Sequence, residues 1–313
     1  MISRTVLIAS LTLAFAAATP LVPLFASSAP SIKRSKSDRD INAIGHRDVM
    51  HRQDPKVVGS SEKEKERGAA GAAAVERSTK LIHDPALTKY LSALAQNLAR
   101  NSDAQMHITV MLIDSDEVDA CTSPGGYQYI TRGLLLRLES EGELAAVLAH
   151  GIAHTALHTP TIQAIRQVLL SVSSVSPIQN SAFTWFTCTA PPLSMFNGMR
   201  PADEFDADYF GVQYLYKAGY DVDGYVRFVQ RIWAAPLSAN GSDVLAFSRF
   251  PPTPDRVRAL RREIADILPQ RREASVSTSV FDEFEENLHI WQAGHPEPQE
   301  PKQPVLRRAD ADK

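Results

Sequence analysis

Three histidines recur at intervals of four residues in the segment EGELAAVLAHGIAHTALH, which runs from residue 141 to residue 158. The apolar residues of this segment have helical spacing: Leu144, Val147, Leu148, Ile152 and Leu157. Side chains four residues apart lie on the same face of a helix, so His150 and His154 can direct two imidazoles at one point. Two imidazoles in this arrangement are typical ligands of a single zinc ion.

The residue directly after His150 determines which chemistry such an ion could support. In hydrolytic sites with this spacing a glutamate stands there as general base, and a general base accelerates a reaction by roughly 10²–10⁴-fold. Gly151 occupies the position here, and Glu143 lies two turns before His150, roughly 10 Å along the helix axis. The pattern therefore predicts a metal site that lacks its base. We expect the glycine to open space beside the metal for a larger ligand or a side chain.

A third ligand is predicted in the segment PADEFDADYFGVQYLYKAGYD, which starts at residue 201 and reads as a helix ending at Gly219. Glu204 can complete a set of two histidines and one carboxylate. Asp208, one turn further on, can accept the free N–H of a ligand histidine and fix its tautomer. The acidic residues of this helix could instead form a solvated face. The histidine helix upstream favours the metal site.

Several elements must position these side chains. A helix is predicted over residues 60–80, and a second begins at the cap Asp84. Residues 106–114 read as a strand, and after the turn at 124–126 residues 127–131 return as its partner. This small sheet could hold an extended polypeptide by backbone pairing, or it could only pack against the histidine helix.

The chain after the histidine helix contains further predicted helices at residues 162–172, 222–232, 253–268 and 279–292. The apolar and aromatic segment 173–199 could be a lid that faces substrate or a membrane, or a buried connector, which we favour. Cys121 and Cys188 could form a disulfide in an oxidising compartment. His158 could extend the metal-binding face; we favour a helix-end residue that interacts with the helix dipole.

Length and composition predict one domain with tails, because 313 residues with 44% apolar content can bury a sizeable core. We expect a cleaved signal peptide over residues 1–29, an extended arm over 30–59, the main domain over 60–293 and a disordered tail over 294–313. The alternative for the first segment is a single membrane anchor. If the chain is exported, we expect it to be periplasmic or secreted. Neither cysteine lies near the signal segment, so we expect no lipid anchor there.

The charge balance restricts the partners. A formal net charge of -3 and an isoelectric point near 6.3 argue against nucleic-acid binding. Peripheral membrane contact through residues 173–199 is compatible with the sequence.

Five motifs, in this order and spacing, resemble the gluzincin metallopeptidases that include the CAAX prenyl proteases and the BepA- and HtpX-like envelope proteases. They read DINAIGHR, SPGGYQYITRGLLLRL, GELAAVLAHGIAHTALH, EFDADYFGVQYLYKAGYD and PPTPDRVRAL, and they extend from about residue 40 to 291. The resemblance implies an α+β, mostly helical, zincin-like domain with a small sheet and an HxxxH helix. It also implies zinc-dependent endoproteolysis, with one zinc ion on His150, His154 and Glu204, and Asp208 supporting a ligand.

Two positions depart from that family pattern. The catalytic glutamate of the family falls on Gly151, and the family's histidine before its conserved arginine falls on Phe250. Arg256 matches the later arginine, so the resemblance gives it a transition-state or structural role. The metal ligands persist, whereas two residues that would handle protons and transition-state charge are replaced.

Three functions fit the sequence. The first is an exported zinc protein of peptidase ancestry that binds polypeptide in the cell envelope with weak or absent proteolysis. The second is an active zinc endopeptidase that uses an unusual base or a hydroxide formed by the metal alone. The third is a structural remnant that binds no metal. We favour the first, because the residues that hold metal are present and the base is absent.

Overall fold

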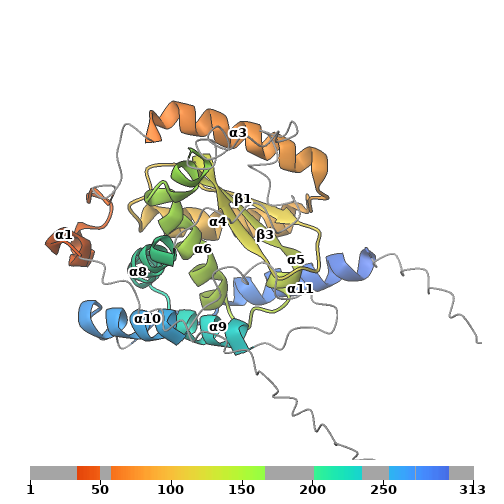
Figure 1. The fold of residues 1–313 in the computed structure, drawn as a ribbon. Helices are drawn as coiled ribbons and strands as arrows, with labels where there is room; N and C mark the ends of the chain where they lie inside the picture. Colours follow the sequence, from red (N-terminus) through yellow and green to blue (C-terminus); the bar gives the residue numbers. More distant parts are fainter. Residues whose placement is uncertain (1–33, 50–57, 166–200, 235–253, 272, 296–313) are drawn as a thin grey trace, which may run out of the picture.

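The computed structural model describes residues 34–49, 58–165, 201–234, 254–271 and 273–295 (Figure 1). Helices enclose a small three-stranded sheet, which confirms the predicted α+β, mostly helical class. The predicted signal segment 1–29 and the apolar segment 173–199 lie outside the described residues. In the part of the chain that is described, no helix has both the length and the apolarity needed to cross a bilayer.

Two capped helices precede the sheet, as predicted. α3 (Ser61–Ser78) begins after Ser60, whose side chain accepts a hydrogen bond from the backbone of Lys63. α4 (Pro85–Arg100) begins after Asp84, which caps two backbone N–H groups, and Pro85 occupies its first turn. The inward stripe of α4 is buried: Leu87, Leu91, Leu94 and Leu98.

The sheet has the strand order β1-β3-β2. β1 (Thr109–Ile113) pairs in parallel with β3 (Tyr127–Thr131), and β2 (Ala120–Ser123) pairs antiparallel with β3 through the turn η2 (Pro124–Gly126). The predicted pairing of the first strand with residues 127–131 is confirmed, but the two strands run parallel, so the predicted hairpin between them is wrong. The turn instead joins β3 to β2, a strand too short to give a clear alternating pattern.

The sheet lies between two helical layers, with α3 across one face and α4 and α6 on the other (Figure 1). Successive side chains of β3 point to opposite faces. Tyr129 packs with Ile113 and Val75 of α3, whereas Ile130 joins the main core with Leu112.

The predicted histidine helix is α6 (Glu141–Ala156), which starts after the cap Ser140 and follows the short α5 (Arg132–Leu135). Every residue of α6 except Val147 and His150 is buried. It packs on α4, on α8 (Pro201–Lys217) and on α9 (Val222–Ala234). Gly211 lets α8 approach α6 closely, because a Cβ atom there would lie 3.1 Å from the Cα of His150.

Two further helices complete the described domain: α10 (Pro254–Ile267) and α11 (Ser279–Gly294). Phe281, Phe284 and Leu288 of α11 are buried, as its sequence pattern predicts. Residues 159–165 are also helical, and the rest of the helix predicted over 162–172 lies outside the described residues.

The segment 30–59, predicted to be extended, is not extended over residues 34–49, which form most of its described part. It contains α1 (Lys36–Arg39) and the 3-10 turn η1 (Ile41–Ala43), and Arg47 is buried in an ion pair with Asp103. Arg47 also donates a hydrogen bond of 2.8 Å to Gln213 on α8. Polar composition suggested an arm, but this buried contact, together with the apolar side chains of Ile44 and Val49, fastens the segment to the domain.

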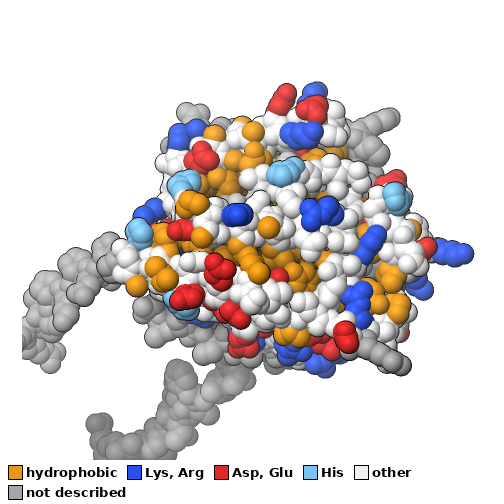
Figure 2. Space-filling view, turned by 180° about the vertical axis from the view of Figure 1, so that it is seen from behind, with side chains coloured by type: hydrophobic (Ala, Val, Ile, Leu, Met, Phe, Trp, Pro, Cys, Tyr) orange, Lys and Arg blue, Asp and Glu red, His pale blue; other side chains and the backbone are white. Residues whose placement is uncertain are grey.

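The described surface has mixed character. Figure 2 shows acidic, basic and apolar side chains interspersed over the reverse face of the molecule. This mixture agrees with the small net charge of the chain.

Candidate metal centre

Three side chains converge where α6 meets α8. The Nε2 atoms of His150 and His154 are 3.1 Å apart. Each of them lies 3.4 Å from an oxygen of the Glu204 carboxylate. One donor atom from each residue lies within 4.8 Å of the others, which defines a group able to hold a metal ion. His154 and Glu204 are buried, and His150 is half-buried.

The donor spacing fits zinc. A tetrahedral zinc ion with bonds of 2.0–2.1 Å needs ligand atoms about 3.3–3.4 Å apart, which follows from the geometry of the tetrahedron. The two imidazole nitrogens are 3.1 Å apart, and each lies 3.4 Å from a different oxygen of Glu204, so these separations are close to that requirement. Two imidazoles and one carboxylate are also a donor set that zinc uses in proteins. The three side chains are therefore placed as a group that could hold a metal ion, and their donor set is compatible with zinc.

Asp208 orients the first histidine. Its Oδ1 atom lies 3.1 Å from Nδ1 of His150 and accepts a hydrogen bond of 2.6 Å from the hydroxyl of Tyr225. The same hydroxyl lies 2.8 Å from Nδ1 of His150. These partners place the proton on Nδ1 and leave Nε2 of His150 directed at Glu204 and His154. Tyr225, on α9, was not identified from the sequence.

Arg256 of α10 closes the network. Its Nε and Nη2 atoms each donate a hydrogen bond of 2.8 Å to the carboxylate of Asp208. Its Nη1 atom lies 3.3 Å from Glu204. The guanidinium thus touches both carboxylates, which gives Arg256 a structural position beside the metal group. Phe250, the second predicted departure, lies outside the described residues.

The electrostatics of the group favour charged carboxylates. Burial alone would raise the pKa of Asp208, but the Arg256 charge and the His150 hydrogen bond hold that pKa well below its ordinary value. Burial also opposes ionisation of Glu204, and hydrogen bonds from His150 and His154 outweigh it and lower its pKa. Burial would lower the pKa of His150, yet Asp208 and Glu204 raise it to about 9. The metal-free group is therefore a buried cluster of alternating charges.

The position after His150 is crowded. A Cβ atom built on Gly151 would lie 2.8 Å from Oγ1 of Thr122 and 2.9 Å from the side-chain amide of Gln128. The space expected beside the metal is thus filled, by side chains of the sheet. Glu143, the other carboxylate on α6 that we considered, pairs with Arg231 and accepts a hydrogen bond of 2.8 Å from the backbone of Glu139. It is engaged away from the metal group.

His158 does not belong to the metal group. It follows Leu157, the C-cap of α6, with a positive φ of 51°, and its Nδ1 atom lies 2.5 Å from the carboxylate of Glu64 on α3. The hydroxyl of Thr161 donates a hydrogen bond of 2.7 Å to the same carboxylate. Glu64 is 1% exposed, so this contact ties α3 to the end of α6 in the interior.

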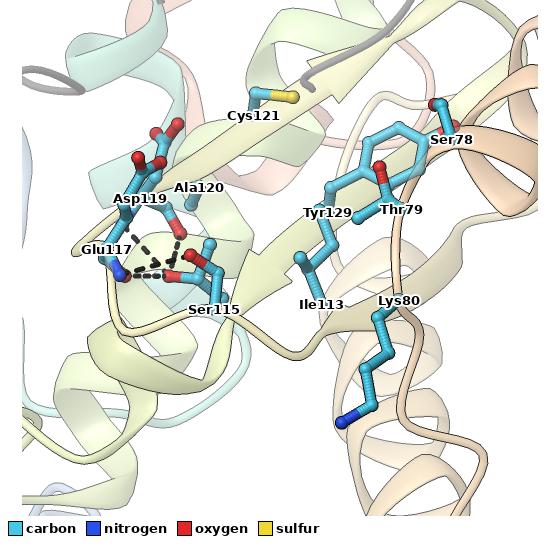
Figure 3. A pocket seen from close by; sticks show the side chains of 11 residues that line it. Ser78, Thr79, Lys80, Ile113, Ser115, Glu117, Asp119, Ala120, Cys121 and Tyr129 are labelled. Atoms are coloured by element: carbon cyan, nitrogen blue, oxygen red, sulfur yellow. Dashed lines mark hydrogen bonds between the residues drawn. The ribbon is translucent and has the colours of Figure 1, made fainter. Parts of the chain in front are cut away.

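A separate cavity of about 310 Å³ lies on the sheet face that carries Tyr129 (Figure 3). Asp119 lines one side of it, and Thr79 and Lys80 line the other. Burial, with the nearby charge of Glu117, raises the pKa of Asp119 to about 7. None of the three metal-group residues lines this cavity.

Cys121 lies on β2, and the structure holds no free thiol at this position. Cys188, its predicted partner, lies outside the described residues, so their pairing stays a prediction.

Comparisons with known proteins identify relatives of this fold. The model of peptidase family M48 matches residues 85–264. The beta-barrel assembly-enhancing protease of Yersinia pestis is 27% identical over 167 residues, which cover 50% of this chain and 34% of that protein. The protein of the same name from Escherichia coli (strain K12) is 26% identical over 170 residues, with the same coverage. A relative from Vibrio cholerae is 27% identical over 164 residues, 49% of this chain and 34% of its own length. The chain thus spans about a third of the length of the curated relatives it matches.

Proposed function

The chain belongs to peptidase family M48, and from this membership we propose a zinc protein of the peptidase fold that binds polypeptide and hydrolyses it weakly or not at all. One zinc ion per chain is bound by His150, His154 and Glu204. The protein acts in the cell envelope on other proteins. A signal peptide over residues 1–29 and a periplasmic location are parts of the same proposal.

One observation carries the proposal: two imidazoles and one carboxylate converge with ligand atoms within 4.8 Å of one another, while the neighbouring position on the helix is glycine. Zinc supplies a Lewis acid that polarises a carbonyl oxygen when it is bound. His150 and His154 hold it, and Asp208 keeps the first imidazole in the tautomer that leaves Nε2 available. Gly151 can neither accept nor donate a proton through a side chain. Hydrolysis is therefore expected to be slower by about 10²–10⁴-fold than in a site with a general base.

Polypeptide binding is supported by the sheet. β2 is an edge strand, and within the described residues no strand pairs with its outer side. An edge of this kind can accept an extended polypeptide through backbone hydrogen bonds. The curated relatives are named for β-barrel assembly, which supports envelope proteins as the ligands.

The test combines metal analysis with two protein assays on the natural chain, on His150→Ala and on His289→Ala. His289 is an exposed residue of α11 and serves as the matched histidine control. We expect about one zinc per chain in the natural protein and in the control, and loss of zinc in His150→Ala. Unfolded casein should bind to the natural protein, as measured by fluorescence anisotropy, with cleavage no faster than in the presence of a chelator.

Two results would replace this proposal. Rapid casein cleavage that is abolished by chelator and by His150→Ala would establish an active zinc endopeptidase. A zinc content far below one per chain after dialysis against zinc would indicate a metal-free remnant.

A further inference from the structure

We propose that Gln128 fills the general-base position of the metal site, so that Gly151 is one member of a repacked group rather than an isolated loss. The inference deepens the proposed function, on which it rests, by identifying what replaced the base. A Cβ atom on residue 151 would lie 2.9 Å from both Cδ and Nε2 of Gln128 and 2.8 Å from Oγ1 of Thr122, closer than real Cβ atoms approach.

The register of the sheet explains why these two side chains meet Gly151. Thr122 on β2 and Gln128 on β3 are direct partners in the antiparallel pair, so they point to the same face. That face packs on α6. Gln128 is 3% exposed, and its Nε2 atom donates a long hydrogen bond of 3.4 Å to the backbone carbonyl of Leu148. This carbonyl lies three residues before Gly151, so Gln128 contacts the helix beside the glycine.

The same contact accounts for a glycine in the middle of a buried helix. Glycine is less favourable than alanine inside a helix. α6 is a buried helix that packs on α4, α8 and α9. Alanine would suit the helix better, but its Cβ atom would require the ends of the Thr122 side chain and of the buried Gln128 side chain to shift. Glycine is therefore the residue that fits at position 151 without a shift of these side chains.

The chemistry of the site changes accordingly. A carboxylate at position 151 could take a proton, whereas the carboxamide of Gln128 donates and accepts hydrogen bonds without taking up a proton at neutral pH. The residues around the metal group then hold a bound polypeptide without activating water for attack. Restoring the glutamate alone would place its side chain in occupied space.

The primary test is a double-mutant cycle in the full chain, with chelator present so that metal plays no part. Gly151→Ala is made in the natural chain and in a chain that also carries Thr122→Ala and Gln128→Ala. We call the second the relieved background, because both neighbouring side chains are shortened. We expect Gly151→Ala to raise the unfolding equilibrium constant by roughly tenfold or more in the natural background, as overpacking does, and by less than about threefold in the relieved one. Gly142→Ala, a second glycine of α6 away from Gln128, is the control and should have the same effect in both backgrounds.

The outcomes separate cleanly. If Gly151→Ala fails to fold in the natural background but folds in the relieved one, the proposal is supported. An equal effect in both backgrounds, or failure to fold in both, would overturn it. The proposed function would survive that result, because it depends on the missing base and not on what fills the space.

A second test measures proteolytic activity. Gly151→Glu in the relieved background should cleave casein faster than Gly151→Glu alone by about 10²-fold or more, the contribution of a positioned base. Equal rates in the two proteins, including no gain in either, would count against Gln128 as the occupant of the base position. Rapid cleavage by the natural chain would defeat the proposed function, and the stability cycle would still report on the packing.

Discussion

Replacing Arg256 with leucine should destabilise the metal-free protein strongly, because the guanidinium is buried between two carboxylates. Its Nε and Nη2 atoms each donate a 2.8 Å hydrogen bond to Asp208, and its Nη1 atom lies 3.3 Å from Glu204. Removing one partner of a buried ion pair leaves the other charge uncompensated and costs about 3–5 kcal/mol. That range corresponds to an increase of roughly 10²–10³-fold or more in the unfolding equilibrium constant, at 1.4 kcal/mol per factor of ten.

Urea denaturation followed by circular dichroism, with chelator present, measures this cost. Arg258→Leu is the matched control, since Arg258 lies on the same helix, is 65% exposed at its side chain and pairs only with the nearby Asp255 among the described contacts. A surface substitution of this kind changes stability by about 0.5 kcal/mol or less. Arg256→Lys keeps the charge without the planar fork, so its cost should fall between the two. Equal midpoints for Arg256→Leu and Arg258→Leu would refute the buried position of Arg256 between the carboxylates.

Three further predictions concern the metal group and its support. Asp208→Asn should lower zinc affinity about 10–100-fold while keeping one zinc per chain, as measured by competition with a chromophoric chelator. Because the pKa of His150 in the metal-free protein is about 9, zinc must displace a proton below that pH. Apparent zinc affinity should therefore rise by about tenfold per pH unit between pH 7 and 9, and a flat profile would contradict the predicted protonation. Glu64→Leu should cost about 1–3 kcal/mol in urea denaturation by leaving buried donors without an acceptor, against about 0.5 kcal/mol or less for the exposed Glu62→Leu.

The histidine pair could be predicted from the sequence because its geometry is local. Residues four apart on a helix share a face whatever the rest of the chain does, and α6 runs over the predicted residues. Predicting Glu204 as a ligand required more than local spacing, because a carboxylate 50 residues downstream is placed by the packing of α8 on α6. The order and spacing of the family motifs supplied that information. The helix cap at Asp84 could likewise be predicted, because capping depends on a few neighbouring residues.

Contacts between helices and strands could not be predicted from the local sequence in this way. Tyr225 lies in an amphipathic helix, where a tyrosine normally indicates core packing, and only the approach of α9 to α8 brings its hydroxyl to Asp208. The parallel pairing of β1 with β3 was missed for a related reason. Strand direction depends on the route of the chain between the strands, and the short β2 within that route carried too weak a pattern to reveal it.

Gln128 is an unusual residue in the sequence of its strand, but its role can be inferred only once the fold is known. It shares the inward face of β3 with Ile130, where an apolar residue is the usual choice, so a buried amide there calls for a partner. The sequence alone gives no reason to connect it with Gly151, 23 residues away. Once β3 packs on α6, the amide occupies the volume that a side chain at residue 151 would need. Regaining a base at this site would then require changes in both the helix and the sheet, because a glutamate that enters alone must first displace a buried, hydrogen-bonded neighbour.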